Sequence, residues 1–307
     1  MISSTMDRSH WRGVMPAITT PFRQDLSVDH EFLRHHVRLL VSHGVTGIVT
    51  PGSLGEGGSL EHDEKIEIWK SCIQVCGDVP VIAAVSALST ARAVKIAQDA
   101  AATGCKGLMV LPPYVYRGSK REMLEYFRTV FESTSLSCML YNNPIAYGTD
   151  FMPEDIGYLA ARHPNLHAVK ESSADVRRLT GIRALCGQRI ALFVGVDDLI
   201  MEGIAAGAEG WIAGLVNALP AESMKLFRCC IEGRPEEVQS LYEWFLPLLR
   251  MDTTYDFVQL IKLVQRELGV VGQGGAITRP PRLLPADAEL NSALGAIRSA
   301  LDNRPNL

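Results

Sequence analysis

The sequence predicts an α/β protein built on a (β/α)₈ TIM barrel with a C-terminal helical extension. Three observations favour this fold. Eight short apolar runs recur at spacings of about 20 to 33 residues, and stretches of helical periodicity separate them. No GxGxxG motif follows the first run, where a doubly wound sheet that binds a dinucleotide would place one. Beyond about residue 231 the alternation stops, and only helical patterns follow.

The eight predicted strands are apolar through most of their length, as expected for a parallel sheet covered by helices on one face and filled by side chains on the other. They lie at residues 14–19, 47–50, 79–85, 107–112, 138–142, 166–171, 190–195 and 210–215. Glycines end two of the connecting helices, at residues 28–44 and 89–104. After an eighth helix at about 220–231, helices are predicted at 235–251, 255–269 and 285–301. We therefore expect a catalytic barrel over residues 1–231 and a helical region over 232–307.

The composition excludes several classes of protein. With 47% hydrophobic residues, 21% charged residues and a net charge of −4, the chain is typical of soluble proteins and lacks a basic face for nucleic acid. No apolar run approaches the length of a membrane span, and the N-terminus lacks the apolar core of a signal peptide. The seven cysteines include no CxxC pair, which favours reduced thiols over disulfides or zinc ligands. We expect a cytoplasmic protein with no nucleic-acid or membrane partner, no metal and no cofactor.

Lys170 stands at the end of the sixth predicted strand, in the segment LHAVKES. Active sites of barrel enzymes lie at the carboxyl ends of the strands, and Lys170 is the only lysine at such an end. Burial among apolar neighbours would lower its pKa and leave an uncharged amine that can attack a carbonyl or imine carbon. The alternative is a structural lysine paired with a carboxylate such as Glu171.

Two further strand ends carry candidate side chains. Tyr141 ends the strand that precedes the one of Lys170, so its hydroxyl could relay protons to and from the amine. The alternative is a core aromatic whose hydroxyl has one partner. The loop after the second strand, GSLGE, offers Ser53 and backbone N–H groups that Gly52 and Gly55 leave accessible. Such a loop can bind a carboxylate.

The segments GSLGE, YNNP and KES, in this order on strands two, five and six, resemble the dihydrodipicolinate synthase / N-acetylneuraminate lyase family. The resemblance extends from GVMPAITTPF to KLVQRELG and implies a class I, Schiff-base-forming barrel enzyme that is expected to be a homotetramer, a dimer of dimers. It implies that Lys170 forms the Schiff base, that Tyr141 relays protons, and that Ser53 with the backbone of Leu54 binds the carboxylate of a 2-oxo acid. The remaining predicted substrate-binding residues are Gly52, Gly195, Ile212 and Tyr147.

Several positions depart from the synthases of this family. Synthases carry an arginine in the loop after strand five that binds the carboxylate of the second substrate, and Ala146 occupies that place here. Ser53-Leu54 stands where the synthases have two threonines, and Val115 aligns with a tyrosine that they contribute across a subunit interface. These departures, with segments such as KESSADVRRLT, resemble instead the Δ1-pyrroline-4-hydroxy-2-carboxylate deaminases of hydroxyproline catabolism.

The resemblance therefore predicts that a cyclic imine carboxylate is deaminated, with dehydration, to 2,5-dioxopentanoate and ammonia. Which group removes the C3 proton is left open between Lys170, acting directly or through water, and Tyr141. The second candidate is an aldolase or dehydratase of 2-keto-3-deoxy sugar acids, and 4-hydroxy-tetrahydrodipicolinate synthase is less favoured. A non-catalytic barrel that binds a 2-oxo acid is the candidate from another class.

Other polar residues are assigned structural roles. The pair Asp197-Asp198 has no third ligand at a suitable spacing, so it is expected to stabilise the N-terminus of the next helix rather than a metal. His36, in the first helix, is expected to be solvated on the outside of the barrel. Glu56 is expected to anchor its own loop through backbone hydrogen bonds.

Overall fold

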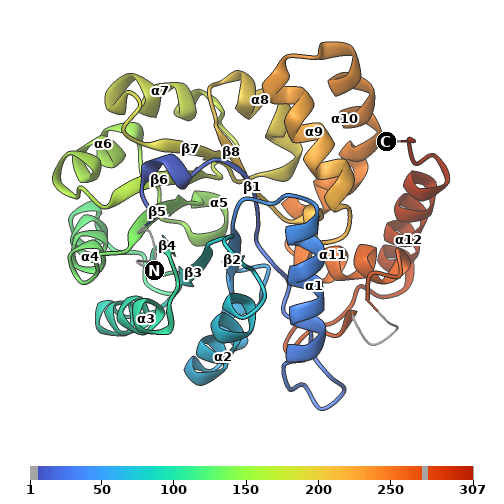
Figure 1. The fold of residues 1–307 in the computed structure, drawn as a ribbon, viewed down its shortest axis with the longest axis horizontal. Helices are drawn as coiled ribbons and strands as arrows, with labels where there is room; N and C mark the ends of the chain where they lie inside the picture. Colours follow the sequence, from blue (N-terminus) through green and yellow to red (C-terminus); the bar gives the residue numbers. More distant parts are fainter. Residues whose placement is uncertain (1–5, 272–275, 307) are drawn as a thin grey trace.

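Figure 1 presents the computed structural model of the chain, in which residues 6–271 and 276–306 are described. Eight parallel strands form one sheet in the order β1-β8-β7-β6-β5-β4-β3-β2, and helices surround it. A bridge between Ala17 and Val49, with a hydrogen bond of 3.0 Å from the Ile18 N–H to the Val49 carbonyl, closes the sheet between its first and second strands. The predicted (β/α)₈ barrel with a C-terminal helical segment is confirmed.

The strands are β1 (Gly13–Pro16), β2 (Ile48–Thr50), β3 (Val81–Val85), β4 (Gly107–Val110), β5 (Ser137–Asn142), β6 (Leu166–Glu171), β7 (Ala191–Val194) and β8 (Gly210–Ala213). The α-helices are α1 (His30–Ser42), α2 (His62–Ile73), α3 (Thr90–Thr103), α4 (Lys120–Glu132), α5 (Pro144–Tyr147), α6 (Pro153–Arg162), α7 (Arg177–Cys186), α8 (Ile200–Ala205), α9 (Pro220–Glu232), α10 (Pro235–Leu249), α11 (Phe257–Glu267) and α12 (Asp287–Asp302). The short 3₁₀ helices of the described residues are η1 (Arg8–His10), η2 (Gly57–Ser59), η3 (Asp197–Leu199), η4 (Leu215–Asn217) and η5 (Arg250–Thr253).

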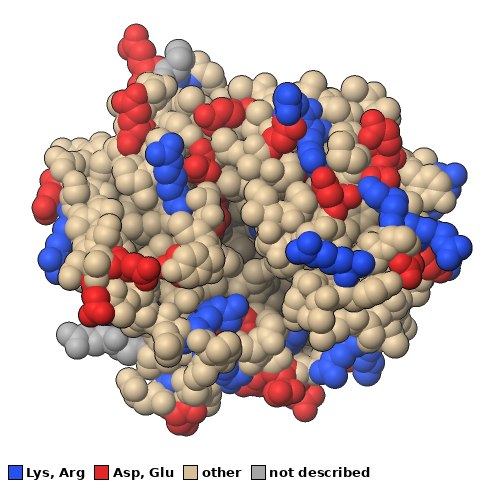
Figure 2. Space-filling view, turned by 180° about the vertical axis from the view of Figure 1, so that it is seen from behind, with Lys and Arg blue, Asp and Glu red and all other residues tan. Residues whose placement is uncertain are grey.

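The N-terminal segment covers the amino ends of the strands. Trp11 is fully buried and donates from its Nε1 to the Ser137 hydroxyl, 2.7 Å away at the start of β5. In Figure 1 this segment lies in front of the barrel, so the opposite view in Figure 2 looks onto the carboxyl ends of the strands. That face is hollowed near its centre, and acidic and basic side chains are interspersed around the hollow (Figure 2).

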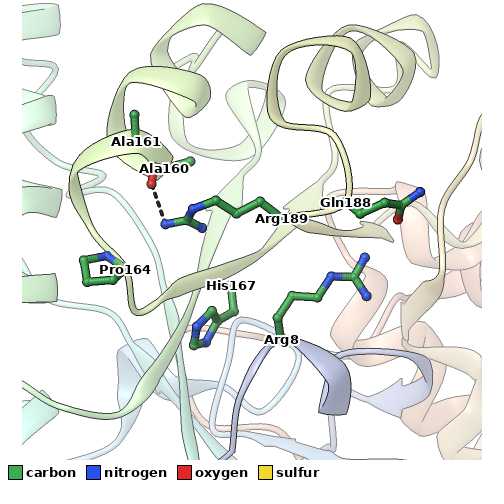
Figure 3. A pocket seen from close by; sticks show the side chains of 7 residues that line it. All are labelled: Arg8, Ala160, Ala161, Pro164, His167, Gln188 and Arg189. Atoms are coloured by element: carbon green, nitrogen blue, oxygen red, sulfur yellow. Dashed lines mark hydrogen bonds between the residues drawn. The ribbon is translucent and has the colours of Figure 1, made fainter.

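A separate cavity of about 420 Å³ lies near the amino end of β6 (Figure 3). It is lined by Arg8, Ala160, Ala161, Pro164, His167, Gln188 and Arg189. Arg189 donates to the carbonyls of Ala160 and His163 at the end of α6 and, at 2.8 Å, to that of Leu166, so it caps that helix. Because His167 is the second residue of β6 and Lys170 the last but one, this cavity lies at the opposite end of the strand from the predicted catalytic amine.

His36 is not at the surface, contrary to the sequence-based expectation. It is 1% exposed, and its Nε2 lies 2.9 Å from Oδ1 of Asn217 in η4. It shares the inner face of α1 with Leu33 and Leu40, at helical spacings of three and four residues. Burial lowers the pKa of His36 to about 4, so the ring is neutral at neutral pH.

The C-terminal helices hold the loop that follows β2. Glu56, fully buried and with a left-handed backbone (φ 55°), accepts from Nζ of Lys262 in α11 at 2.6 Å and from the backbone N–H of Arg279 at 2.9 Å. Lys262 also donates to the carbonyls of Thr20 and Ile277, each at 2.7 Å. The backbone of Glu56 does bond within its own loop, to Ser53 at 3.0 Å and Ser59 at 2.9 Å, as expected, whereas its carboxylate bonds to the C-terminal region.

Replacing Lys262 with methionine is expected to destabilise the protein by about 3 to 5 kcal/mol, because the buried Glu56 carboxylate loses its buried cation at 2.6 Å and keeps only the more distant Arg282 at 3.7 Å. Denaturant unfolding of the variant measures this loss. The double variant Glu56→Met, Lys262→Met should be less destabilised than the sum of the two single variants. Additive effects of the two substitutions would contradict a buried, mutually dependent pair.

Candidate active site

The register of β5 and β6 brings two predicted catalytic residues together. Tyr141 pairs with Lys170 across the two parallel strands, and Nζ of Lys170 lies 4.1 Å from the centre of the Tyr141 ring. Both side chains are buried, with exposed fractions of 7% for Lys170 and 5% for Tyr141. Their positions one residue before the ends of the strands place them at the carboxyl face of the barrel.

Lys170 is an amine largely removed from water. Burial lowers its pKa below the ordinary range for lysine, and the charges of Asp252, Tyr147 and Asp197 partly oppose that shift. No ion pair joins it to Glu171 within the described residues, since the Glu171 carboxylate accepts from Nδ2 of Asn142 at 3.0 Å and from the Ser173 N–H at 2.7 Å. The structural alternative of a Lys170–Glu171 pair therefore does not hold. The environment favours the uncharged, nucleophilic form of the amine.

The Tyr141 hydroxyl belongs to a short polar chain. Nδ2 of Asn143 donates to it at 3.0 Å, and the ring of Tyr147 meets its ring edge to face at 5.7 Å. Burial raises the pKa of Tyr141, an effect that the hydrogen bond from Asn143 opposes. The phenol therefore keeps its proton at neutral pH and can donate it beside the lysine.

Tyr147 connects the loop after β2 to this pair, because it contacts both Ser53 and the Tyr141 ring. The hydroxyls of Ser53 and Tyr147 are hydrogen-bonded to each other, and burial raises the pKa of Tyr147. Among the hydrogen bonds of the described residues, none uses the backbone N–H of Ser53 or Leu54, while the Gly52 carbonyl accepts from the Gly57 N–H at 2.9 Å. The loop thus presents one hydroxyl and two N–H donors, a set that suits one carboxylate.

The comparison with known families agrees with this arrangement. The model of the Dihydrodipicolinate synthetase family matches residues 10–301. This chain belongs to that family. A 4-hydroxy-tetrahydrodipicolinate synthase of Geobacter metallireducens is 31% identical over 289 residues, which cover 94% of this chain and 97% of the relative. One from Methanothrix thermoacetophila is 32% identical over 241 residues, covering 78% and 81%.

The fold comparison reaches the same family. A crystal structure of a dihydrodipicolinate synthase superposes with a TM-score of 0.86 at 27% identity and covers 95% of this chain and 99% of that one. Members of the dihydrodipicolinate synthetase family are class I Schiff-base lyases, so the chain is an enzyme of this class. The two relatives are named for the synthase activity, which the sequence analysis placed below deamination.

In this member of the dihydrodipicolinate synthetase family, Gly195 leaves room for the side chain of Lys170, the predicted catalytic amine. A Cβ added to Gly195 would lie 2.6 Å from Cε and 2.7 Å from Cγ of Lys170, and closer still to the Ser172 hydroxyl. The sequence analysis counted Gly195 among substrate-binding residues, and its contacts show that it packs on the lysine stem. Ile212, in β8, is 1% exposed and lies in the barrel core.

Gly195→Ala is expected to slow formation of the Schiff base by about 100-fold, because the displaced Nζ no longer reaches the attack geometry. Mass spectrometry of the borohydride-trapped pyruvate adduct at timed intervals measures the rate. Gly157→Ala in α6 is the matched control, since a Cβ there finds its nearest neighbour at 3.7 Å. Equal trapping rates in the two variants would contradict this role for Gly195.

Two acidic residues of the site have contacts that the sequence did not reveal. Asp197 and Asp198 open η3, which leads into α8, as expected for a pair at a helix N-terminus. The Asp197 carboxylate is also fully buried and accepts from Nε1 of Trp211 at 2.9 Å and from the N–H groups of Gly214 and Leu215, at the start of η4, at 3.0 and 2.9 Å. Asp252, in η5, was not predicted, although its charge acts on both Lys170 and Tyr141. Because η5 belongs to the C-terminal helices, the rule that searches strand ends does not reach it.

Metal binding has no support within residues 6–271 and 276–306, where no three His, Cys, Asp or Glu side chains gather closely enough to hold an ion. None of the helices in these ranges combines the length and apolarity needed to cross a bilayer. All seven cysteines are free thiols, and five of them are buried.

Proposed function

We propose that this enzyme deaminates and dehydrates Δ1-pyrroline-4-hydroxy-2-carboxylate to 2,5-dioxopentanoate and ammonia. One observation carries the proposal. In the loop after β5, Ala146 stands where the synthases use an arginine, and the neighbouring Tyr147 hydroxyl is bonded to Ser53. The loop therefore supplies no cation for a second carboxylate, and the carboxylate donors at Ser53 and Leu54 match a substrate that carries only one.

The site residues support the following sequence of steps. The neutral Lys170 amine attacks the C2 imine carbon, and the ring opens by transimination, which leaves the former ring nitrogen as an amine on C5. Tyr141 supplies and recovers the protons of this exchange. Loss of a C3 proton forms an enamine, the C4 hydroxyl departs as water, and C5 becomes an imine. Hydrolysis of that imine releases ammonia, and hydrolysis of the lysine adduct releases 2,5-dioxopentanoate, for a net uptake of one water.

The synthase activity is the alternative that a specific observation favours. Arg117, in the loop after β4, packs against Gly148, since a Cβ added there would lie 2.5 Å from Nε of Arg117. Its guanidinium is thus close to Tyr147 in the sequence-distant loop after β5 and could bind a second carboxylate. The names of the curated relatives point the same way. An aldolase or dehydratase of 2-keto-3-deoxy sugar acids would use the same lysine and tyrosine.

Parallel assays separate these activities. The purified protein is given Δ1-pyrroline-4-hydroxy-2-carboxylate, pyruvate with aspartate semialdehyde, or 2-keto-3-deoxy sugar acids, and ammonia, condensation product and pyruvate are measured. We expect ammonia release with the cyclic imine and a kcat/KM at least about 100-fold lower for the other substrates, because a missing or added charged contact costs several kcal/mol. Condensation without ammonia release would overturn the deaminase. A trapped adduct without turnover of any substrate would favour a binding protein.

We also propose that the chain forms the expected homotetramer. The loop after β4 exposes three consecutive large side chains, with exposed fractions of 39% for Tyr114, 73% for Val115 and 57% for Tyr116, and Ile145 in α5 is 73% exposed. Exposed apolar runs of this kind are typical of subunit interfaces. Light scattering after gel filtration measures the mass. Val115→Asp should lower it, and Ile231→Asp in α9, whose isoleucine is 51% exposed, should leave it unchanged.

A further inference from the structure

Asp252 reaches the catalytic face from outside the barrel. It lies in η5, between α10 and α11, and η5 packs against η3, which follows β7. Its Oδ1 lies so close to Gly214, after β8, that a Cβ on that glycine would overlap it, and Cδ1 of Ile261 would be 2.8 Å away. Gly214 therefore leaves the space that lets a carboxylate from the C-terminal helices approach the carboxyl end of β8.

Asp252 differs from the other buried carboxylate of the site in having unoccupied oxygens. The Asp197 oxygens accept from Trp211, Gly214 and Leu215, as described above. For Asp252, the described residues provide no hydrogen bond and no ion pair within 4.0 Å, and its side chain is only partly exposed. Of the two carboxylates, only Asp252 has lone pairs available to a bound substrate.

The charges around Asp252 suit a group that gains and loses one proton. Burial and the charge of Asp197 raise the pKa of Asp252, whereas a positive charge at Lys170 lowers it. The iminium formed at Lys170 carries a positive charge that the neutral amine lacks, so formation of the adduct favours the carboxylate form of Asp252. Gly214 directly follows Ala213, the last residue of β8, so the Asp252 carboxylate lies at the carboxyl face of the barrel, the face that also carries Lys170 and Tyr141.

We propose that Asp252 is a catalytic residue that carries the C3 proton of the Lys170 adduct to the C4 hydroxyl. The C4 step rests on the proposed deaminase function, whereas the C3 step applies to any 2-oxo acid bound to Lys170. The Asp252 carboxylate takes the proton from C3, and the C–H electron pair forms the enamine double bond. The carboxyl then gives the same proton to the C4 oxygen as the enamine electrons expel it. Water leaves, the carboxylate is restored, and the iminium is conjugated with the new C3=C4 bond.

Hydrogen–deuterium exchange of pyruvate tests the C3 step without the deaminase substrate. In D₂O, the enamine forms and is then protonated with deuterium, so deuterium replaces the methyl hydrogens of pyruvate. Proton NMR follows the loss of the methyl signal. Asp252→Asn should lower the exchange rate by about 100-fold or more, the usual contribution of a general base, while the borohydride-trapped pyruvate adduct at Lys170 still forms. Asp256→Asn is the matched control, because it lies four residues along the same segment and its side chain caps no helix.

Each outcome decides the role of Asp252. Two results would overturn this role. The first is exchange at the wild-type rate in Asp252→Asn. The second is a parallel loss of adduct and exchange, which is the result expected of a residue that only positions Lys170. Asp252→Ser provides a second variant if the asparagine lowers the melting temperature. If the wild-type protein releases no ammonia from the cyclic imine but Asp252→Asn still lowers the rate of pyruvate exchange, the proposed substrate is wrong and Asp252 is retained as the base at C3. If ammonia is released, Asp252→Asn should lower that rate by about 100-fold as well.

Discussion

Lys170→Met is expected to abolish the Schiff base and to lower turnover by at least about 1,000-fold, because no other lysine of the described residues contacts the Tyr141 ring and could bond covalently to the substrate there. The measurement is the mass of the protein after incubation with pyruvate and borohydride, followed by peptide mapping. Wild type should carry one adduct on the peptide that contains Lys170, and the variant should carry none. Since burial already disfavours the charged amine, methionine of similar length should not reduce the free energy of unfolding.

Lys95→Ala provides the control for this variant. Lys95 is a surface lysine with a side chain that is 64% exposed, paired with Asp99 in α3. Its removal should change neither the adduct nor the rate, because exposed ion pairs contribute less than about 1 kcal/mol. An adduct that persists in Lys170→Met, or one that maps elsewhere in wild type, would remove the mechanism.

Tyr141→Phe is the second substitution with a large expected effect. It removes one hydroxyl from a residue that is 5% exposed while keeping the ring, so the fold should persist. We expect the rate of adduct formation to fall by about 100- to 1,000-fold, because the protons of the carbinolamine then have to be transferred without a positioned acid or base. The end point of trapping should reach the wild-type level, since Lys170 itself is retained.

Tyr126→Phe in α4 is a matched control for the loss of a buried phenol. Tyr126 is 3% exposed, and its hydroxyl has no hydrogen-bond partner among the described residues. Its removal should leave the rate unchanged and the stability equal or slightly higher, because an unpaired buried hydroxyl is costly. A Tyr141→Phe variant that traps pyruvate as fast as Tyr126→Phe would exclude a proton relay at residue 141.

The sequence-based prediction of strands succeeded, because strand periodicity is a local signal. It located β5 and β6, and the structure places Tyr141 and Lys170 side by side at the carboxyl ends of these strands, where their predicted catalytic roles require them. The sequence-based prediction was wrong for His36, because its partner Asn217 is distant in the chain and lies in η4. It did not identify the partner of the Glu56 carboxylate for the same reason, since Lys262 follows Glu56 by more than two hundred residues. Periodicity within a helix or loop carries no signal of such partners.

What the order of amino acids determines here is therefore the alternation of strands and helices and the reactive groups at the strand ends. What depends on closure of the barrel is the environment of those groups. The Lys170 amine becomes weakly basic only when the surrounding strands exclude water, and Gly195 leaves space for its stem only once β7 lies beside β6. Asp252 joins the site only because the C-terminal helices fold back over β8, and electrostatic effects depend on distances in space rather than along the chain.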